Sequence, residues 1–401
     1  MAKRLLVVFL MLAVVCALLT GCWDRKEMDD FSIVAALGID KVEDEGRYEV
    51  TIELINPPEV VGGKEAASGR SSTTTIYSAK GDTLVSAIRR ISQQTPRETF
   101  FPYTQVIIIG EELARSGIED IFDLLERNQE FRSTPRVLIA KDNTAKNTLS
   151  ILSPLEKIPA EKLLKTSKVS GESLGETISV KVLEFGRKFT SEGIEPLASG
   201  VSIIGQSEDG QSQSNIEQTT PNSLIKSEGV ALFKKGKLVR WVDREEARGI
   251  LYVINKIDRA IVTLDCNQKT KALSISVTDT RTTFRAFKTE RTPAIDIHVK
   301  QEAEVEEVLC EMDVADRHSI LDIEKQLEEK TKQEIEKAIE IAKEENSDVF
   351  GFGEAINRER PKAWRDIKKN YEEIFPELEV NIQVDAYVIK TGMRKETYRR
   401  E

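Results

Sequence analysis

The chain has 401 residues, with 58 Lys and Arg against 68 Asp and Glu, a formal net charge of −10, and 40% hydrophobic residues. This acidic balance argues against nucleic-acid binding, and four cysteines are too few for a disulfide scaffold. Because single cores seldom grow beyond about 250–300 residues, the length predicts two or three domains, each with its own core.

The N-terminus has the features of an export signal with a lipid attachment site. Lys3 and Arg4 precede an apolar run over 5–19, shorter than the roughly 20 residues of a membrane-spanning helix. The run leads through Leu-Thr-Gly to Cys22, which resembles the lipobox of bacterial lipoproteins. In such signals the cysteine is acylated and becomes the new N-terminus. We therefore expect a signal peptide over 1–21 and a lipid on Cys22; an ordinary cleavable signal and an uncleaved anchor are the alternatives.

Removal of the signal makes the exported part more acidic. It leaves 56 basic residues against 68 acidic ones, because Lys3 and Arg4 are lost, so the net charge becomes −12. An anionic membrane surface mildly repels such a chain. Attachment to the membrane must then come from the lipid and from protein partners, since no later apolar run is long enough for a second membrane segment.

Strands and helices alternate irregularly over 22–205, the expected N-terminal α/β domain. Apolar and alternating runs predict strands at 31–38, 48–55, 76–78, 106–110 and 136–140. Helical patterns cover 81–91, 118–127 and 173–188. Several strands neighbour in sequence, so the order favours a mixed α+β fold over a doubly wound one.

Residues 206–223 almost lack apolar side chains, so burial there cannot offset the entropy of ordering them. We expect a polar linker or long surface loop, the best domain boundary in the chain. A C-terminal α+β domain follows over 224–401, with a further split near residue 300 left open.

The C-terminal domain begins with a predicted hairpin, strands 229–233 and 237–242 around Lys234-Lys235-Gly236. A helix at 245–255, strands at 272–277 and 294–299, and a long amphipathic helix over 319–346 follow. Ser319 with Asp322 resembles a capping box at the start of the long helix. The charged outer face of this helix is typical of a solvated surface, with the apolar stripe packed on the core. Because the stripe narrows near Thr331, the helix could instead form a seam with a partner helix. A helix over 363–375 and a strand over 379–389 end the chain.

Two cysteines remain after Cys16 leaves with the signal and Cys22 carries lipid. A disulfide between Cys266 and Cys310 is compatible with export. Two cysteines in so long a chain more often stay unpaired and buried, and we expect that here.

No arrangement of residues points to catalysis, a metal or a cofactor. His298 shares a strand face with Asp296, a pattern more typical of an exposed strand residue than of a functional pair. Gly351-Phe-Gly353 lacks the third glycine of a nucleotide loop, and no serine lies in a Gly-x-Ser-x-Gly elbow. We expect no enzyme activity and no cofactor beyond the lipid on Cys22, although abundant carboxylates leave a paired-acid site open.

A family resemblance rests on four motifs that follow in order along the chain. They are Gly21-Cys22-Trp23-Asp24 with Glu27; Ala36-Leu37-Gly38-Ile39-Asp40; Glu228-Gly229-Val-Ala-Leu-Phe233 with Lys237-Leu238-Val239; and Asp348-Val-Phe350-Gly351-Phe352-Gly353 with Pro361, Trp364 and Gly392. Together they resemble the Ger(x)C family of spore germination lipoproteins, the C subunits of nutrient germinant receptors. Arg240 departs from the glycine or small residue expected before Trp241.

The resemblance implies a non-enzymatic, multi-domain subunit on the outer face of the spore inner membrane. It would assemble there with a multi-spanning A subunit and a transporter-like B subunit, and direct germinant binding is left open. Only Cys22 carries over with a chemical role. Trp23 and Asp24 are either a juxtamembrane contact or a simple tether. The aromatic residues near Gly351 are expected mainly in the core.

Two other function classes remain. A substrate-binding lipoprotein of an importer needs two similar lobes around a polar cleft, and no repeated lobe pattern is visible. An exported hydrolase needs a pocket with a carboxylate pair of perturbed pKa.

Overall fold

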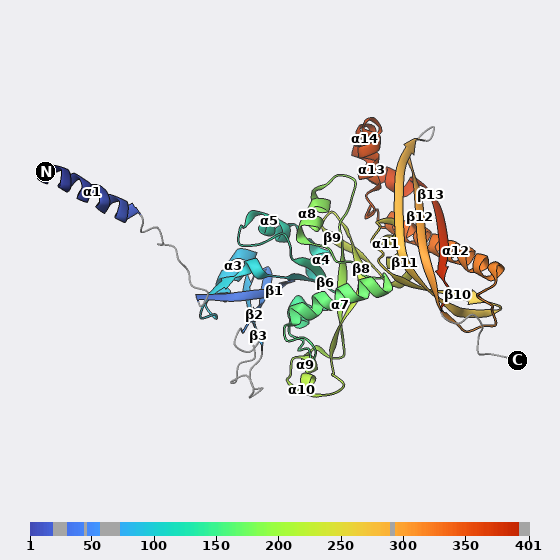
Figure 1. Ribbon diagram of the computed structural model, residues 1–401, viewed down its shortest axis with the longest axis horizontal. Helices are drawn as coiled ribbons and strands as arrows, with labels where there is room; N and C mark the ends of the chain where they lie inside the picture. Colours follow the sequence, from blue (N-terminus) through green and yellow to red (C-terminus); the bar gives the residue numbers. More distant parts are fainter. Residues whose placement is uncertain (19–29, 44–45, 57–72, 289–292, 393–401) are drawn as a thin grey trace.

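The computed structural model describes residues 1–18, 30–43, 46–56, 73–288 and 293–392. Two sheets, one of nine and one of four strands, lie side by side along the long axis of the molecule (Figure 1). The α+β class predicted from the sequence is confirmed. The sheets differ in size and strand order, unlike the two similar lobes of an importer's binding protein.

The first sheet has the order β3-β2-β1-β5-β6-β7-β8-β9, with β4 added beside β1. Strands β1, β5, β6 and β7 run parallel, while β2, β3, β8 and β9 pair antiparallel. The strand bounds are β1 (Phe31–Lys41), β2 (Tyr48–Ile55), β3 (Thr74–Gly81), β4 (Glu98–Phe100), β5 (Val106–Gly110), β6 (Arg136–Ala140), β7 (Leu197–Ile204), β8 (Leu224–Lys234) and β9 (Lys237–Val242).

Helices cover both faces of this sheet. Side chains alternate along β5, so Ile107 and Ile109 join one core while Val106 and Ile108 join the other. The first core lies under α3 (Leu84–Ile91), α4 (Glu111–Ser116), α5 (Glu119–Arg127) and α8 (Val182–Thr190). The second lies under α6 (Ala145–Leu149) and α7 (Pro159–Leu174). The single helix predicted over 173–188 is therefore wrong: Gly175, left-handed at φ 64°, ends α7, and α8 is a separate helix.

The second sheet has the order β10-β11-β12-β13. Its strands are β10 (Ala260–Cys266), β11 (Lys269–Lys288), β12 (Pro293–Val308) and β13 (Glu379–Lys390). The long helix α12 (Arg317–Glu344) packs across one face with α11 (Arg244–Val253). The remaining pieces, between α12 and β13, are α13 (Phe352–Glu359), α14 (Pro361–Ile367), η4 (Lys368–Asn370), α15 (Tyr371–Ile374) and η5 (Phe375–Glu377).

The start and the middle of α12 differ from the prediction. Asp316 caps the helix by accepting from the backbone N–H groups of His318 and Ser319, so the expected box of Ser319 and Asp322 is wrong. Thr331, where the stripe narrows, is fully buried and bonds to Gln301 of β12. The narrow point is thus a buried polar contact within the chain.

The polar segment 206–223 carries two one-turn helices, α9 (Ser207–Gly210) and α10 (Ser214–Glu217). It connects β7 to β8, which pair with each other in the first sheet. Asn215, fully buried, donates to the backbone carbonyl groups of Leu152 and Ser223 and so fixes this segment. The segment is a surface loop of the first sheet, and the sheet continues past the expected boundary to Val242.

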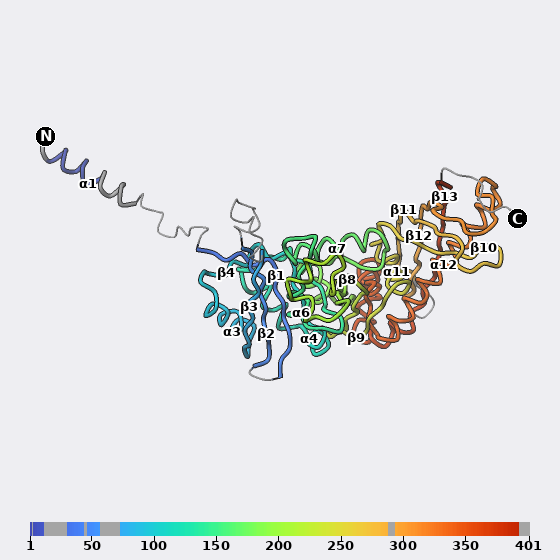
Figure 2. Tube along the Cα trace, turned by 90° about the horizontal axis from the view of Figure 1, so that it is seen from below, coloured from blue at the N-terminus to red at the C-terminus, as the bar shows by residue number. Residues whose placement is uncertain are grey.

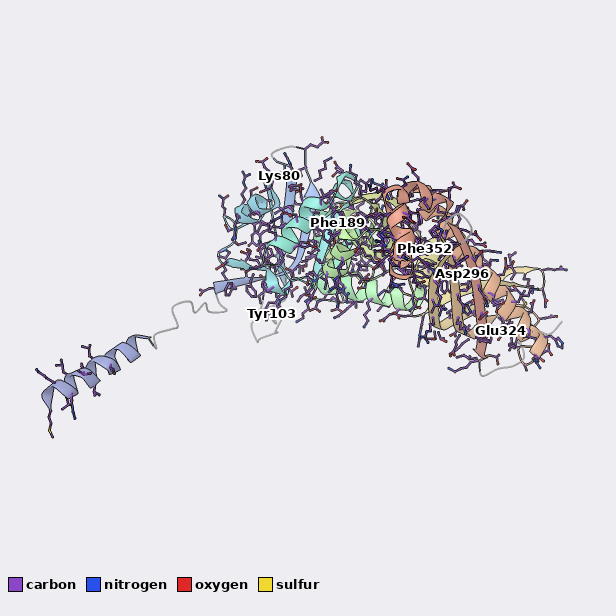
Figure 3. All side chains as sticks on the ribbon, turned by 90° about the horizontal axis from the view of Figure 1, so that it is seen from above. Lys80, Tyr103, Phe189, Asp296, Glu324 and Phe352 are labelled. Carbon is purple, nitrogen blue, oxygen red and sulfur yellow. A yellow bond between two sulfur atoms is a disulfide. The ribbon has the colours of Figure 1, made fainter. Side chains whose placement is uncertain are left out.

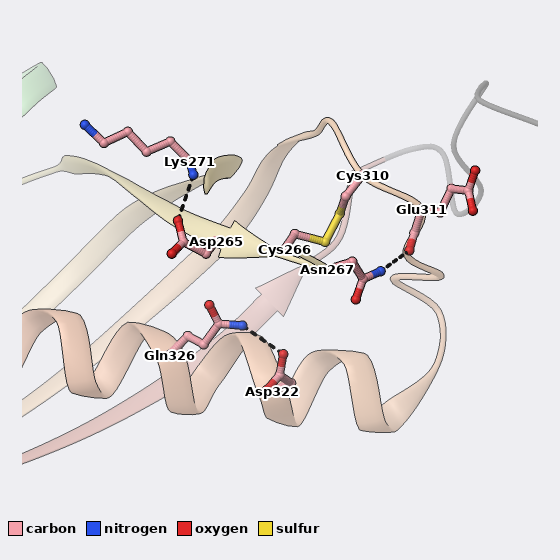
Figure 4. The surroundings of a disulfide bond; sticks show 8 residues. All are labelled: Asp265, Cys266, Asn267, Lys271, Cys310, Glu311, Asp322 and Gln326. Atoms are coloured by element: carbon pink, nitrogen blue, oxygen red, sulfur yellow. Dashed lines mark hydrogen bonds between the residues drawn. A yellow bond between two sulfur atoms is a disulfide. The ribbon is translucent and has the colours of Figure 1, made fainter. Parts of the chain in front are cut away.

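Cys266 and Cys310 form a disulfide, with their Cα atoms 6.1 Å apart, which corrects the expectation of two free thiols (Figure 4). The bond joins the end of β10 to the segment after β12, and both cysteines are buried. Their separation of 44 residues hid the pairing, because β11 and β12 bring these two ends together.

Candidate functional site at the junction of the two sheets

The predicted lipid site Cys22 and its neighbours Trp23 and Asp24 lie outside the described residues. The helix α1 before them covers Ala2–Leu18. Within the described part of the chain, no helix combines the length and apolarity needed to cross a membrane. The described motifs of the family resemblance lie at the start of α6, along β8 and β9, and at the junction of the two sheets.

Asp348 is the centre of the junction. Its buried carboxylate accepts from the backbone N–H groups of Gly351 and Phe352 at 2.9 and 3.1 Å through Oδ1, and from Gly353 at 2.8 Å through Oδ2. The Tyr371 hydroxyl donates to Oδ2 at 2.6 Å. Burial raises the pKa of the Asp348 carboxyl above its ordinary value, while these four donors oppose the rise. The Gly-Phe-Gly sequence therefore surrounds a buried acid at the start of α13 with its backbone N–H groups.

Glycines let two backbone segments touch at this junction. A Cβ on Gly193 would lie 2.8 Å from Cα of Gly353, and Gly193 itself has φ 80°. The carbonyl of Gly193 accepts from the N–H of Glu354, and the N–H of Glu195 donates to the carbonyl of Asp348. The segment before β7 is thereby docked on the start of α13 through main-chain bonds.

Aromatic side chains fill the space around these bonds. Trp364 is 3% exposed and meets Tyr371 edge to face at a centroid distance of 5.0 Å. Phe350 stacks on Phe352, which also contacts Phe284 of β11. Trp364, Phe350 and Phe352 are buried, so the prediction that they lie mainly in the core is confirmed. Figure 3 shows Phe189 and Phe352 on the two sides of the junction.

A cavity of about 290 Å³ opens beside Asp348 and Trp364. Glu195 and Lys234 line it from the first sheet, and Glu372 lines it from α15. The Lys234 ammonium lies 3.4 Å from both carboxylates. Burial raises the pKa of Glu195, and Lys234 opposes that rise. Lys235 supplies the second positive charge, 2.7 Å from Glu372, so the two lysines balance the two glutamates and the cavity is an ion-paired seam between the two halves.

A second motif residue, Asp40, caps a helix of the first sheet. Its carboxylate accepts from the N–H groups of Ala145 and Lys146 at 2.7 and 3.0 Å, at the start of α6. Burial raises the pKa of Asp40 to about 6. Gly38, two residues earlier, gives α6 room, since a Cβ there would lie 3.0 Å from Leu149 and 3.2 Å from Ala145.

Glu53 supports α7 in a similar way, from a buried position that the alternating pattern of β2 did not indicate. The side chain is fully buried and accepts from the N–H of Ala160 at 3.1 Å. Burial raises the pKa of Glu53 to about 8. Strand β2 is an inner strand covered on both faces, which its alternation did not reveal.

The third motif holds β8 and β9 in place. Gly229 has φ 73°, and a Cβ there would lie 2.3 Å from Oδ1 of Asp243. Lys141 pairs with Asp243 at 2.8 Å and lies over the Trp241 ring, 5.3 Å from its centroid. The predicted hairpin around Gly236 is confirmed.

Two arginines connect this region to α12. Arg240, which departs from the family pattern, donates to Glu344 at 2.8 Å and to Glu345 at 3.3 Å. The hairpin turn is unaffected, because it lies at Lys235 and Gly236. Arg248 of α11 is buried and donates to Glu334 of α12 at 2.8 Å through Nε. No motif indicates this pair; its only signal in the sequence is a charged residue on the apolar stripe of each helix.

The histidines give no sign of catalysis. His298 lies 2.7 Å from Asp385 of β13, not beside Asp296, which instead accepts from Asn381. His318 is an exposed residue at the start of α12. Over the described ranges, no group of three or more His, Cys, Asp or Glu residues is placed to hold a metal ion.

Comparisons with known proteins match two family models to successive parts of the chain. The model of a family described as "Spore germination protein N-terminal domain" matches residues 24–203, and that of "Spore germination B3/ GerAC like, C-terminal" matches residues 228–392. The unmatched residues between them include the polar segment 206–223.

Individual relatives cover nearly the whole chain. "Spore germination protein KC" of Bacillus subtilis (strain 168) is 30% identical over 98% of this chain and 97% of its own length. "Spore germination protein B3" of the same organism is 23% identical over 98% of both chains. A crystal structure of the GerBC protein matches with a TM-score of 0.55 at 17% identity, covering 88% of this chain and 96% of that one, and supports the fold. With matching family models across both halves and a full-length relative at this identity, the chain belongs to the Ger(x)C family of spore germination proteins, the C subunits of germinant receptors.

Proposed function

We propose that this protein is a lipid-anchored, non-enzymatic subunit of a spore nutrient germinant receptor, held on the outer face of the spore inner membrane. The observation that carries the proposal is the full-length family match joined to a lipobox cysteine at the head of the matched region. The family match supports the role in germination, and Cys22 supplies the means of attachment.

The anchor follows from the chemistry of acylation. Each buried methylene of an acyl chain contributes roughly 0.8 kcal/mol, so two or more chains of palmitate length hold a protein durably on a bilayer. The exported chain has a net charge of −12 and gains nothing from an anionic surface. The lipid on Cys22 would therefore supply the attachment that the rest of the chain lacks.

The proposal of a non-enzymatic role is supported by what the motif residues do. The carboxylates of Asp348 and Asp40 each hold backbone N–H groups, and Gly229 leaves room for the side chain of Asp243. Motif residues that stabilise the fold are consistent with a subunit that acts by assembling with the A and B membrane subunits. Germinant binding by this subunit is not part of the proposal.

The proposal is tested by replacing the lipidated cysteine in the full-length protein. Cys22→Ala is expected to lose metabolic labelling by palmitate, to leave the membrane fraction in flotation, and to stop co-purifying with the A and B subunits from detergent-solubilised spore membranes. Cys16→Ala is the matched control, because it changes a cysteine in the same N-terminal region and leaves the lipobox intact. A Cys22→Ala protein that still floats with membranes and carries palmitate would contradict the anchor.

A further inference from the structure

Three aromatic side chains gather at the end of the first sheet where the described chain resumes after Cys22. Phe31 begins β1, Phe100 ends β4, and Tyr103 ends η3 (Phe101–Tyr103). The ring centroids of Phe31 and Phe100 are 4.9 Å apart, and those of Phe100 and Tyr103 are 5.7 Å apart. We call these three residues the aromatic cluster.

The cluster is formed by the topology of the sheet. Strand β4 pairs in parallel with the first residues of β1, which places Ile33 opposite Phe100. Proline at the first turn of η3 then brings Tyr103 back beside Phe100. Figure 2 shows β4 at the end of the folded part opposite the four-stranded sheet.

The cluster is open to its surroundings. Tyr103 is 55% exposed, and Phe31 and Phe100 are half-buried. The Arg132 guanidinium lies 5.9 Å from the Tyr103 ring centroid, and exposed Arg97 directly precedes β4. Exposed Asp30 and Glu98 lie on the same end, so the local charge is mixed although the chain as a whole is acidic.

Aromatic rings with arginine stems alongside are typical of protein surfaces at the membrane–water interface. Tyrosine and tryptophan rings favour the headgroup level, and long basic side chains lay their methylenes along apolar surface while the charge stays in the polar layer. The chain length adds a geometric limit: the nine residues from Cys22 to Phe31 span at most about 30 Å when fully extended. A lipid on Cys22 would keep the aromatic cluster within that reach of the bilayer.

We propose that the aromatic cluster rests in the headgroup layer of the membrane that anchors the protein, with Arg97 and Arg132 directed to lipid phosphates. This inference rests on the proposed lipidation of Cys22. The first sheet then faces the bilayer with its β1–β4 end, and the four-stranded sheet stands on the side away from it.

The test uses the lipidated full-length mature chain in vesicles of phosphatidylcholine and phosphatidylglycerol. Tyr103→Cys and Tyr387→Cys proteins carry a small fluorophore on the new thiol. Cys266 and Cys310 are paired and Cys22 is acylated, so the substituted position is the one labelled. Tyr387 is the matched control, because it is also a tyrosine, is 51% exposed, and lies on β13 of the far sheet. The measurement is quenching by lipids with a spin label in the headgroup.

Quenching several-fold stronger at Tyr103→Cys than at Tyr387→Cys is the expected result. Flotation of the same vesicles tests the lipid anchor separately from the placement of the aromatic cluster. If the chain floats but both positions are quenched equally, or Tyr103→Cys is not quenched because water surrounds it, the inference is overturned while the anchor stands. If the unlabelled chain does not float at all, the anchor fails and the inference fails with it.

Discussion

Replacing Asp348 by alanine removes the acceptor on which the junction is built. Three backbone N–H groups and the Tyr371 hydroxyl donate to its carboxylate, and the residue is 4% exposed. Each buried donor left without a partner costs roughly 1–3 kcal/mol. Four such donors predict a loss of at least about 4 kcal/mol, a large share of the 5–15 kcal/mol that stabilises a typical domain.

Urea denaturation of the soluble chain that starts after Cys22 measures this loss. Tryptophan fluorescence is followed in a background with Trp23 and Trp241 replaced by phenylalanine, so that Trp364, which packs on Tyr371, reports the junction. Asp348→Asn keeps one oxygen acceptor and should lose about half as much. Asp296→Ala is the control, since that exposed aspartate bonds to Asn381 at the surface and its loss should cost under about 0.5 kcal/mol. A loss at Asp348→Ala no larger than at the control would refute the account of the junction.

Three further predictions concern buried groups elsewhere. Burial raises the pKa of Glu53 from 4.5 to about 8, so the folded protein binds this proton more tightly than the unfolded chain does. The protonated Glu53 therefore contributes its full stabilisation of the fold below pH 4.5. This contribution is lost as the pH rises toward 8, at up to about 1.4 kcal/mol per pH unit. Denaturation midpoints at pH 5–8 should fall less steeply in Glu53→Gln, and parallel curves would argue against this role. Replacing both Cys266 and Cys310 by serine should lower the free energy of unfolding by about 2–4 kcal/mol relative to the oxidised wild type. The reduced wild type is the control and should match the double variant, because it lacks the same bond. Gly193→Ala should destabilise the junction by about 2 kcal/mol or more, because its Cβ would meet Gly353; an unchanged melting temperature would contradict that close approach.

The sequence predicted most elements because local patterns determine them. The hairpin at 229–242 has turn residues between two apolar runs, and Lys235 and Gly236 take the positive φ values such a turn requires. The apolar stripe of α12 predicted a long helix within a few residues of its observed ends. These features need no knowledge of distant partners.

The misses depend on contacts between residues far apart in the chain. Whether Glu53 is exposed depends on α7, more than a hundred residues later, and whether Cys266 meets Cys310 depends on the pairing of β11 with β12. The polar segment 206–223, expected as a linker or a long surface loop, is a loop, but its composition did not indicate that Asn215 bonds to Ser223 and to the carbonyl of Leu152, 63 residues earlier. The composition of a short segment does not reveal partners that lie far away in the sequence.

In the candidate site too, the sequence identified residues but did not reveal the contacts that they make with distant parts of the chain. Family motifs identified Asp348, Gly351 and Gly353 as characteristic residues, but not what they do together. The four donors around the carboxylate come from the following turn and from Tyr371, and Gly193 approaches from the other half of the chain. Arg248 and Glu334 belong to no motif, so only the packing of α11 on α12 shows their contact.

The central claim is that a lipid on Cys22 attaches this protein to the membrane and that its role in the receptor requires this attachment. Germination of spores tests the claim most directly. Spores that carry Cys22→Ala as the only copy of this protein are exposed to the nutrient that triggers the parent strain, and the fall in optical density is followed. The account predicts slow or absent germination with Cys22→Ala and parental rates with Cys16→Ala. Parental rates from spores whose Cys22→Ala protein is present but unattached to membrane would contradict it.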